Sequence, residues 1–164
     1  MEKIYLAGGC FWGTQYFFSL VPGVIMTKVG YANGTKESPS YEEVCSKQYN
    51  FAETVEVTYD EEKIQLNIIL QKFFLTINPT SLNKQGGDIG LQYRTGIYYL
   101  DVKTKSIASE ELNNLQKKYK DEIQIELLPL DNFYNAEEYH QDYLYKNPKG
   151  YCHIPYDVFK KAKE

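Results

Sequence analysis

The stretch Ile4-Tyr5-Leu6-Ala7-Gly8-Gly9-Cys10-Phe11-Trp12-Gly13 joins a short apolar run to a cysteine through two glycines. The apolar run predicts a buried strand over residues 4–7, and the residues from Phe11 to Leu20 predict a helix that ends before Pro22-Gly23. The stretch therefore predicts a turn from strand to helix with Cys10 at the start of the helix.

Strands and helices continue to alternate beyond this stretch. The cleanest strand is Ala52 to Tyr59, and Asp60 is expected to cap a helix whose apolar residues run from Leu66 to Ile77. The other predicted elements are strands over residues 24–31, 94–102 and 123–128 and helices over 40–45, 106–119 and 137–145. This alternation predicts an α/β fold, a mixed sheet with helices packed on it. The polar loop 78–92 is longer than a simple connection needs, so it is a candidate functional loop.

Composition excludes several classes of protein. The 164 residues carry a net charge of −4, which gives no general reason to bind nucleic acid or anionic lipid. The longest run without a charged or amide side chain, Ile4 to Thr14, is too short to span a membrane. No linker divides the chain, so residues 1–164 are predicted to be one domain with a mobile, irregular tail from about residue 146. Three widely spaced cysteines do not form a disulfide framework, so we expect a cytoplasmic protein. We also expect a monomer.

Cys10 is the first candidate for chemistry. A sulfur at the start of a helix faces unpaired N–H groups and the positive end of the helix dipole, which favour the nucleophilic thiolate. The neighbouring glycines allow another molecule to approach the backbone. A small cysteine buried in the core explains the same position.

Glu53 is the second candidate, because it shares its strand parity with Val55, Val57 and Tyr59. Alternation turns its carboxyl group toward the buried face, where a raised pKa can keep it protonated as a general acid. A position at the strand end, with the carboxylate in water, is the alternative.

The other cysteines and the histidines give weaker signals. Cys152 could attack a sulfenic acid and form a disulfide, or it could be an unused surface thiol. Cys45 is interpreted as a packing residue. Only Cys152 and His153 are close enough in sequence to suggest a metal site, and adjacent residues are poorly placed to share one ion. No bound metal is therefore expected.

The residues Gly9-Cys10-Phe11-Trp12-Gly13 resemble the active-site motif of peptide methionine sulfoxide reductases of the A type. Further segments recur in that family in the same order, among them Pro39-Ser40-Tyr41, Ala52-Glu53, Gln92-Tyr93-Arg94, Tyr139-His140-Gln141 and Gly150-Tyr151-Cys152. The resemblance covers nearly the whole chain. It implies a two-layer α/β sandwich with a ferredoxin-like core and a long coil-rich C-terminal segment.

The resemblance also implies a role for each matching residue. Cys10 would attack the sulfur of methionine S-sulfoxide, Glu53 would protonate its oxygen, and Cys152 would resolve the resulting sulfenic acid. The implied substrate-binding residues are Tyr41 and Tyr93 at the oxygen, Asp88 at the pocket, and Phe11 and Trp12 as an apolar wall for the methyl group.

The resemblance implies no bound cofactor, with thioredoxin or a small dithiol as electron donor and oxidised proteins or free methionine sulfoxide as substrate. The chain departs from the family pattern at Asn50-Phe51, where Gly-His is common, and at Ile77-Asn78, where His-Asp is common, so the polarity of the pocket stays open. A thiol peroxidase and a non-catalytic module that binds oxidised methionine are the rival functions.

Overall fold

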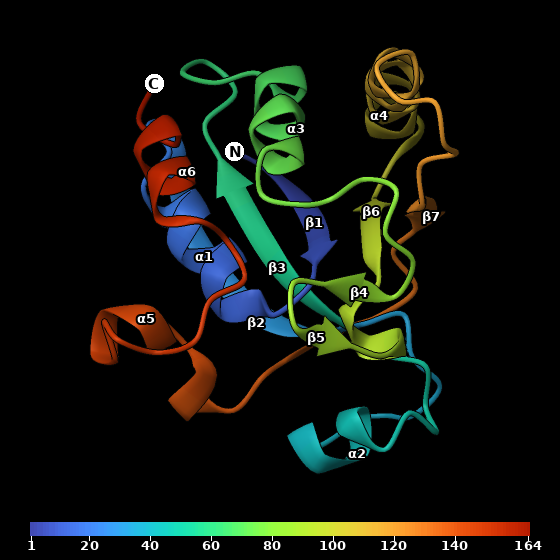
Figure 1. Cartoon of the computed structure of the whole chain (residues 1–164), viewed down its shortest axis with the longest axis vertical. Coiled ribbons are helices and arrows are strands. Elements are labelled where there is room, and N and C mark those ends of the chain that lie inside the picture. Colours follow the sequence, from blue (N-terminus) through green and yellow to red (C-terminus); the bar gives the residue numbers. More distant parts are fainter.

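The fold is built on a six-stranded mixed sheet with the strand order β7-β6-β1-β3-β2-β8. The computed structural model describes residues 1–164 (Figure 1). The strands of this sheet are β1 (Glu2–Gly8), β2 (Val24–Ala32), β3 (Ala52–Tyr59), β6 (Thr95–Tyr99), β7 (Ile125–Pro129) and β8 (Phe133–Asn135). All neighbouring pairs are antiparallel except β6 and β7, which run parallel. A separate short hairpin consists of β4 (Lys84–Gln85) and β5 (Asp88–Ile89).

Helices cover one face of the sheet. The helices of the chain are α1 (Phe11–Ser19), α2 (Tyr41–Cys45), α3 (Leu66–Phe74), α4 (Val102–Gln116), α5 (Tyr143–Lys146) and α6 (Tyr156–Lys161). The main core lies between this face and α1, α3, α4 and α6, and strand β3 supplies Val55, Val57 and Tyr59 to it. None of the helices combines the length and the apolar character needed to cross a bilayer.

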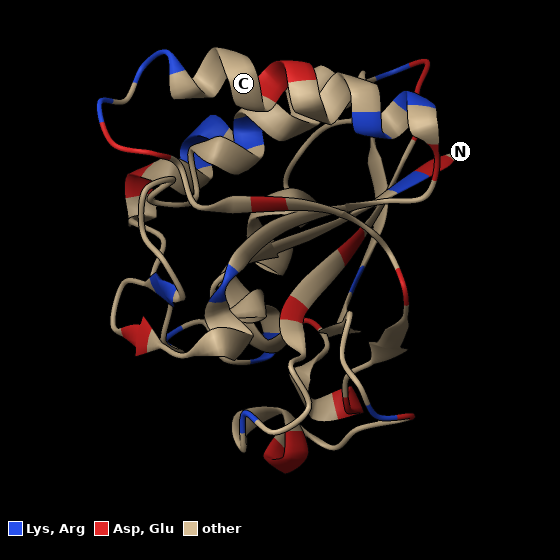
Figure 2. Ribbon diagram, turned by 90° about the vertical axis from the view of Figure 1, so that its right-hand side faces the viewer, with Lys and Arg blue, Asp and Glu red and all other residues tan.

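A smaller cluster covers the opposite face of the sheet, with Tyr5 and Tyr98 at its centre. Buried polar groups on this face are paired: Tyr5 donates a hydrogen bond of 2.8 Å to Glu56, and Tyr98 donates one of 2.8 Å to Glu126. Both faces of β3 are thus buried, with its two sets of alternating side chains in different clusters. Charged residues of both signs are interspersed on the helices and loops around the sheet (Figure 2).

The structure confirms the mixed α/β fold, the strand–turn–helix at Cys10 and a short helix within residues 40–45, where Ser40 forms a capping box that starts α2. It corrects the start of α3, which begins at Leu66 and not at Asp60. The Asp60 carboxylate accepts a hydrogen bond of 3.0 Å from the backbone N–H of Glu62 and so closes a local turn, which competes with helix formation.

The predicted helix over residues 137–145 is wrong. The chain forms a 3₁₀ helix (Glu138–His140), then passes through Asp142 at φ 53°, and then forms α5. The side chain of Gln141 explains the break, because its amide pairs with both backbone groups of Val29 on β2, at 3.0 and 2.9 Å. Tertiary pairing to the sheet thus replaces the local helix.

The C-terminal segment also differs from the irregular tail that the sequence predicted. After α5 ends at Lys146 it contains α6, and Ile154 is buried in the main core. The edge strand β8 was missed as well, because only three residues pair with β2. Whether the segment is mobile remains a prediction.

Candidate active site

Cys10 is the N-cap residue of α1, directly after the end of β1. The turn depends on Gly9, whose φ of +87° suits glycine and whose α-carbon faces Gln85 so closely that a β-carbon would lie 2.7 Å from its Cβ. The thiol is 7% exposed. The turn therefore brings a nearly buried sulfur to the open end of a helix.

The environment of Cys10 corrects the expectation of a resting thiolate. Burial raises the pKa of the thiol most strongly, and the charge of Glu53 raises it further. A hydrogen bond from the backbone of Trp12 at the helix start lowers it, as the sequence predicted, but this effect is outweighed. The free protein therefore holds Cys10 as a thiol at neutral pH.

Glu53 lies on β3 with its carboxyl group buried, only 1% exposed. Its Oε1 accepts a hydrogen bond of 3.3 Å from the backbone N–H of Phe11, and its Oε2 has no partner. Burial raises the pKa of this carboxyl group to about 8. The group is therefore protonated at neutral pH and has one oxygen free to donate a proton, as the strand alternation predicted.

The predicted polar residues converge around Cys10 and Glu53 from separate elements. Burial raises the pKa of Tyr41, on α2, and of Tyr93, after the β4–β5 hairpin, and the charge of Glu53 raises both further. Asp88 on β5 raises the pKa of both Cys10 and Glu53, and its Oδ2 is buried without a partner. The loop 78–92 thus supplies part of the site.

The apolar side of the site consists of Phe11 and Trp12. Phe11 is buried against Tyr31 and His140, at ring-centroid distances of 5.8 and 5.3 Å. The partly buried indole of Trp12 stacks on Tyr143 at 3.7 Å, and its Nε1 donates a hydrogen bond of 3.0 Å to Nδ1 of His140. The indole is therefore held on one face and at its polar edge.

Sequence reasoning missed the residues that support the site. His140 is 1% exposed, and burial lowers its pKa, which keeps Nδ1 free to accept the indole N–H. Glu137 accepts hydrogen bonds from the Tyr31 hydroxyl at 2.8 Å and from the Tyr41 backbone N–H at 3.0 Å, which fixes the start of α2. Both residues lie in segments that carried the family resemblance, but no pattern in the sequence indicated their contacts.

The two other cysteines also lie near the site. The sulfur of Cys152 lies against Gly13 in the first turn of α1, where a β-carbon would overlap it. It accepts a hydrogen bond of 3.3 Å from the backbone N–H of Ile154, and burial raises the pKa of its thiol. Cys45 ends α2 near Tyr41, and burial raises its pKa as well. No three His, Cys, Asp or Glu side chains converge on a point that could hold a metal ion.

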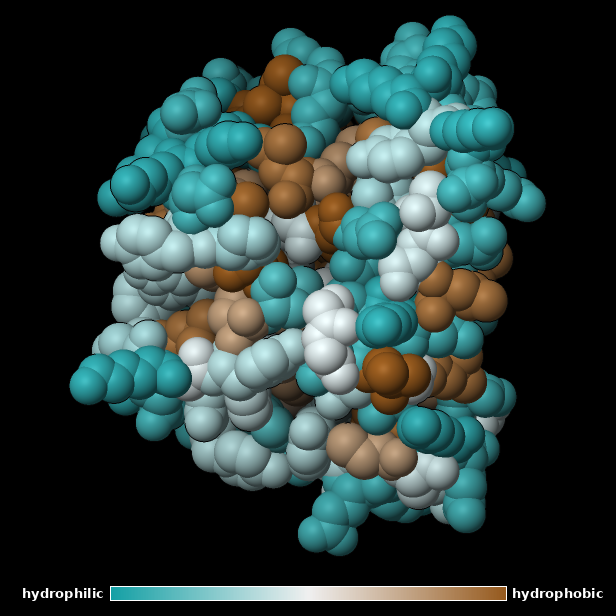
Figure 3. Space-filling view, viewed as in Figure 1, coloured by the Kyte–Doolittle hydropathy of each residue, from teal (hydrophilic) through white to brown (hydrophobic).

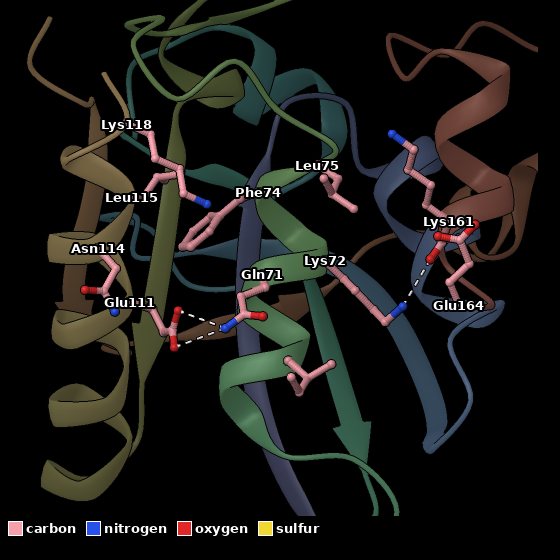
Figure 4. A pocket seen from close by; sticks show the side chains of 11 residues that line it. Gln71, Lys72, Phe74, Leu75, Glu111, Asn114, Leu115, Lys118, Lys161 and Glu164 are labelled. Atoms are coloured by element: carbon pink, nitrogen blue, oxygen red, sulfur yellow. Dashed lines mark hydrogen bonds between the residues drawn. The ribbon is translucent and has the colours of Figure 1, made fainter. Parts of the chain in front are cut away.

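A groove elsewhere on the surface contains none of these residues. It lies between α3, α4 and the C-terminus, where Gln71 contacts Glu111 and Lys72 donates a hydrogen bond of 3.0 Å to the backbone of Lys161 (Figure 4). Beside the β4–β5 hairpin, apolar side chains are open to solvent (Figure 3), and Ile89 is 65% exposed. The chemistry therefore concentrates at Cys10 and not in the groove.

Comparison with known proteins gives consistent matches over nearly the whole chain. The sequence profile of the family described as peptide methionine sulfoxide reductase matches residues 2–164. The peptide methionine sulfoxide reductase MsrA of Lachnoclostridium phytofermentans is 55% identical over 162 residues, which are 99% of this chain and 98% of that protein.

Two solved structures of Mxr1 from Saccharomyces cerevisiae share the fold. The reduced form has a TM-score of 0.86 and 39% identity, and the match covers 92% of this chain and 88% of Mxr1. The structure of Mxr1 in complex with Trx2 has a TM-score of 0.61 and 26% identity, and its match covers 87% of this chain and 84% of that chain.

Proposed function

The chain belongs to the peptide methionine sulfoxide reductase family, and on this basis we propose how its residues reduce methionine S-sulfoxide. The enzymes of this family are thiol-dependent oxidoreductases. Cys10 is the nucleophile and Glu53 is the acid. The observation that carries these roles is the protonated, buried carboxyl group of Glu53, with one unpaired oxygen, next to a buried thiol at a helix start.

The protons and electrons of the reduction step are exchanged among Cys10, Glu53 and the substrate alone. Glu53 donates its proton to the sulfoxide oxygen, where negative charge develops, and the resulting carboxylate takes the proton of the Cys10 thiol. The Cys10 sulfur attacks the sulfoxide sulfur, the sulfur–oxygen bond of the sulfoxide breaks, and the hydroxyl group passes to Cys10, which becomes a sulfenic acid as methionine leaves. This exchange explains why a thiol with a raised pKa can still react: it loses its proton only when the neighbouring acid has given its own away.

The phenol groups of Tyr41 and Tyr93 stabilise the same oxygen. Burial keeps both hydroxyls protonated at neutral pH, so each can donate a hydrogen bond toward the developing charge. Asp88 shapes the pocket from the hairpin side, and the wall formed by Phe11 and Trp12 receives the methyl group. Because the Trp12 indole is fixed by its hydrogen bond and its stacking, the wall favours a substrate that presents a small apolar group to it. This preference also discriminates between the two sulfoxide epimers.

Cys152 resolves the sulfenic acid, and thioredoxin reduces the disulfide that forms. The position of the Cys152 sulfur on the first turn of α1 supports this role, and the yeast complex of Mxr1 with Trx2 supports thioredoxin as the donor. The electrons pass through cysteine alone, so no bound cofactor is needed. The substrates of this protein are oxidised proteins or free methionine sulfoxide. The protein acts as a monomer, and it works in a reducing compartment, the cytoplasm.

The test is turnover of a peptide that contains methionine S-sulfoxide, with thioredoxin, thioredoxin reductase and NADPH. Cys10→Ser is expected to abolish methionine release, whereas Cys45→Ser, a cysteine variant outside the reaction, is expected to keep it. Release by the Cys10→Ser variant would overturn the assignment. Equal binding of the peptide by both variants without any turnover by the parent protein would favour a binding module instead.

A further inference from the structure

His153, the residue directly after Cys152, is a partly buried histidine that none of the proposed steps uses. Both of its ring nitrogens are shut off from solvent, and the backbone groups of Gly8 and Thr76 lie within reach of the ring. Burial lowers the pKa of the ring to about 4, so the side chain is neutral at neutral pH. A ring whose two nitrogens are closed off from water loses its hydration, and its place therefore calls for an explanation.

The ring of His153 lies in a slot between two glycines. A β-carbon at Gly9, in the turn before Cys10, would lie 3.1 Å from His153 Cε1, and one at Gly86, in the β4–β5 hairpin, would lie 2.7 Å from His153 Cβ. Gly86 has a φ of +61°, so glycine is favoured there by its backbone as well. The slot thus joins the turn that carries Cys10 to the hairpin that carries Asp88.

The residues around His153 alternate between two surfaces. Tyr151 and His153 both face the hairpin, where the Tyr151 hydroxyl accepts a hydrogen bond of 3.2 Å from the backbone N–H of Gly87. Cys152 and Ile154 both face Gly13 on α1, and Ile154 is 4% exposed. With Tyr151 and His153 held against the hairpin, the Cys152 side chain between them faces α1.

We propose that His153 is a positioning residue for the resolving step, because its ring in the slot between Gly9 and Gly86 turns the Cys152 thiol toward α1 and Cys10. This inference rests on the proposed function. In that step the thiol sulfur of Cys152 bonds to the sulfur of the Cys10 sulfenic acid, the sulfur–oxygen bond breaks, and the hydroxyl leaves as water with the thiol proton. The oxidising equivalent for this disulfide comes from the sulfoxide that was reduced in the first step.

The size of the effect follows from intramolecular reaction rates. A thiol on a flexible tether has an effective concentration in the millimolar range, whereas a thiol held in the correct geometry can exceed this by orders of magnitude. Loss of the ring removes one of the contacts that hold the segment and leaves those of Tyr151 and Ile154. We therefore expect disulfide formation to slow by about 10-fold in His153→Ala.

The experiment follows two signals after mixing reduced protein with one equivalent of peptide methionine S-sulfoxide, without reductant. Methionine release reports the first step, and loss of the Cys152 thiol with appearance of the linked Cys10–Cys152 peptide reports the second. His153→Ala is expected to release methionine at the rate of the parent protein and to form the disulfide about 10-fold more slowly. Tyr156→Ala, which alters a residue 80% exposed in the same segment, is the matched control and is expected to change neither rate.

Each result is decisive. Disulfide formation at the parent rate in His153→Ala overturns the inference, and so does equal slowing of both steps, which would show a general loosening of the Cys10 turn. If the parent protein itself releases methionine but forms no Cys10–Cys152 link, the resolving role of Cys152 fails and the inference fails with it. The result for the parent protein thus distinguishes failure of the His153 inference from failure of the proposed resolving role of Cys152.

Discussion

Replacing Glu53 by Gln is expected to remove a large pH dependence of stability. The carboxyl group is buried in the folded state with a pKa of about 8, against an ordinary value of 4.5. Between these two values the folded protein holds a proton that the unfolded chain has lost, so rising pH favours unfolding. The stabilisation is fully present below pH 4.5 and is lost as the pH rises to about 8.

The magnitude follows from the same two pKa values. Each pKa unit corresponds to about 1.4 kcal/mol, so the loss for one group moved from 4.5 to about 8 amounts to about 5 kcal/mol. That is a large part of the stability of an ordinary domain. Gln has nearly the same shape, stays neutral at every pH and can still accept the hydrogen bond from the backbone N–H of Phe11.

The assay is urea unfolding of both proteins at a series of pH values between 4.5 and 8.5, with the free energy of unfolding extrapolated to water. The two proteins are expected to differ little at the acid end, and the Gln variant to be the more stable by up to about 5 kcal/mol at the alkaline end. Titrating groups that do not interact with Glu53 are common to both proteins and cancel in the difference. A difference that does not change with pH would refute the argument that Glu53 is buried in its neutral form.

The remaining predictions concern catalysis and packing. Cys152→Ser is expected to release one methionine per protein molecule and then stop with thioredoxin as the only reductant, as a burst assay would show, and continuous turnover would contradict its role. His140→Phe removes the acceptor of the Trp12 indole N–H, so the KM for a sulfoxide peptide is expected to rise about 5-fold with a smaller change in kcat; an unchanged KM would show that stacking alone holds the indole. Ile69→Ala, at a fully buried position on α3, is expected to cost about 3 kcal/mol in urea unfolding, whereas Ile25→Ala, 48% exposed, is expected to cost less than about 1 kcal/mol.

Local patterns predicted the elements that depend on local forces. The alternation of β3, the short helix within residues 40–45 and the glycine turn before Cys10 each follow from neighbouring residues, and the structure contains all three. The burial of Glu53 followed from the same alternation. These features required no knowledge of distant contacts.

The errors occur where a distant partner decides the local structure. Gln141 interrupts a helical pattern because its amide pairs with β2, more than 100 residues earlier in the chain. His140 supports the site through its contact with Trp12. Glu137 supports it through contacts with Tyr31 and Tyr41. The spacing of these residues in the sequence does not indicate such contacts. The thiol of Cys10 shows the same limit, because the sequence indicated both the helix start and the alternative of burial but not which of the two effects on the pKa is larger.

The side-chain amide of Gln141 pairs with the backbone of β2 beyond the end of β8. This side chain accepts a hydrogen bond from the N–H of Val29 and donates one to the C=O, which also accepts one from the N–H of Ala136 just after β8. An unpaired strand border invites a second molecule to add its own backbone, which is a common route to aggregation. The N–H of Val29 is thus capped by a side chain, so the edge of β2 offers one backbone donor fewer to a second chain.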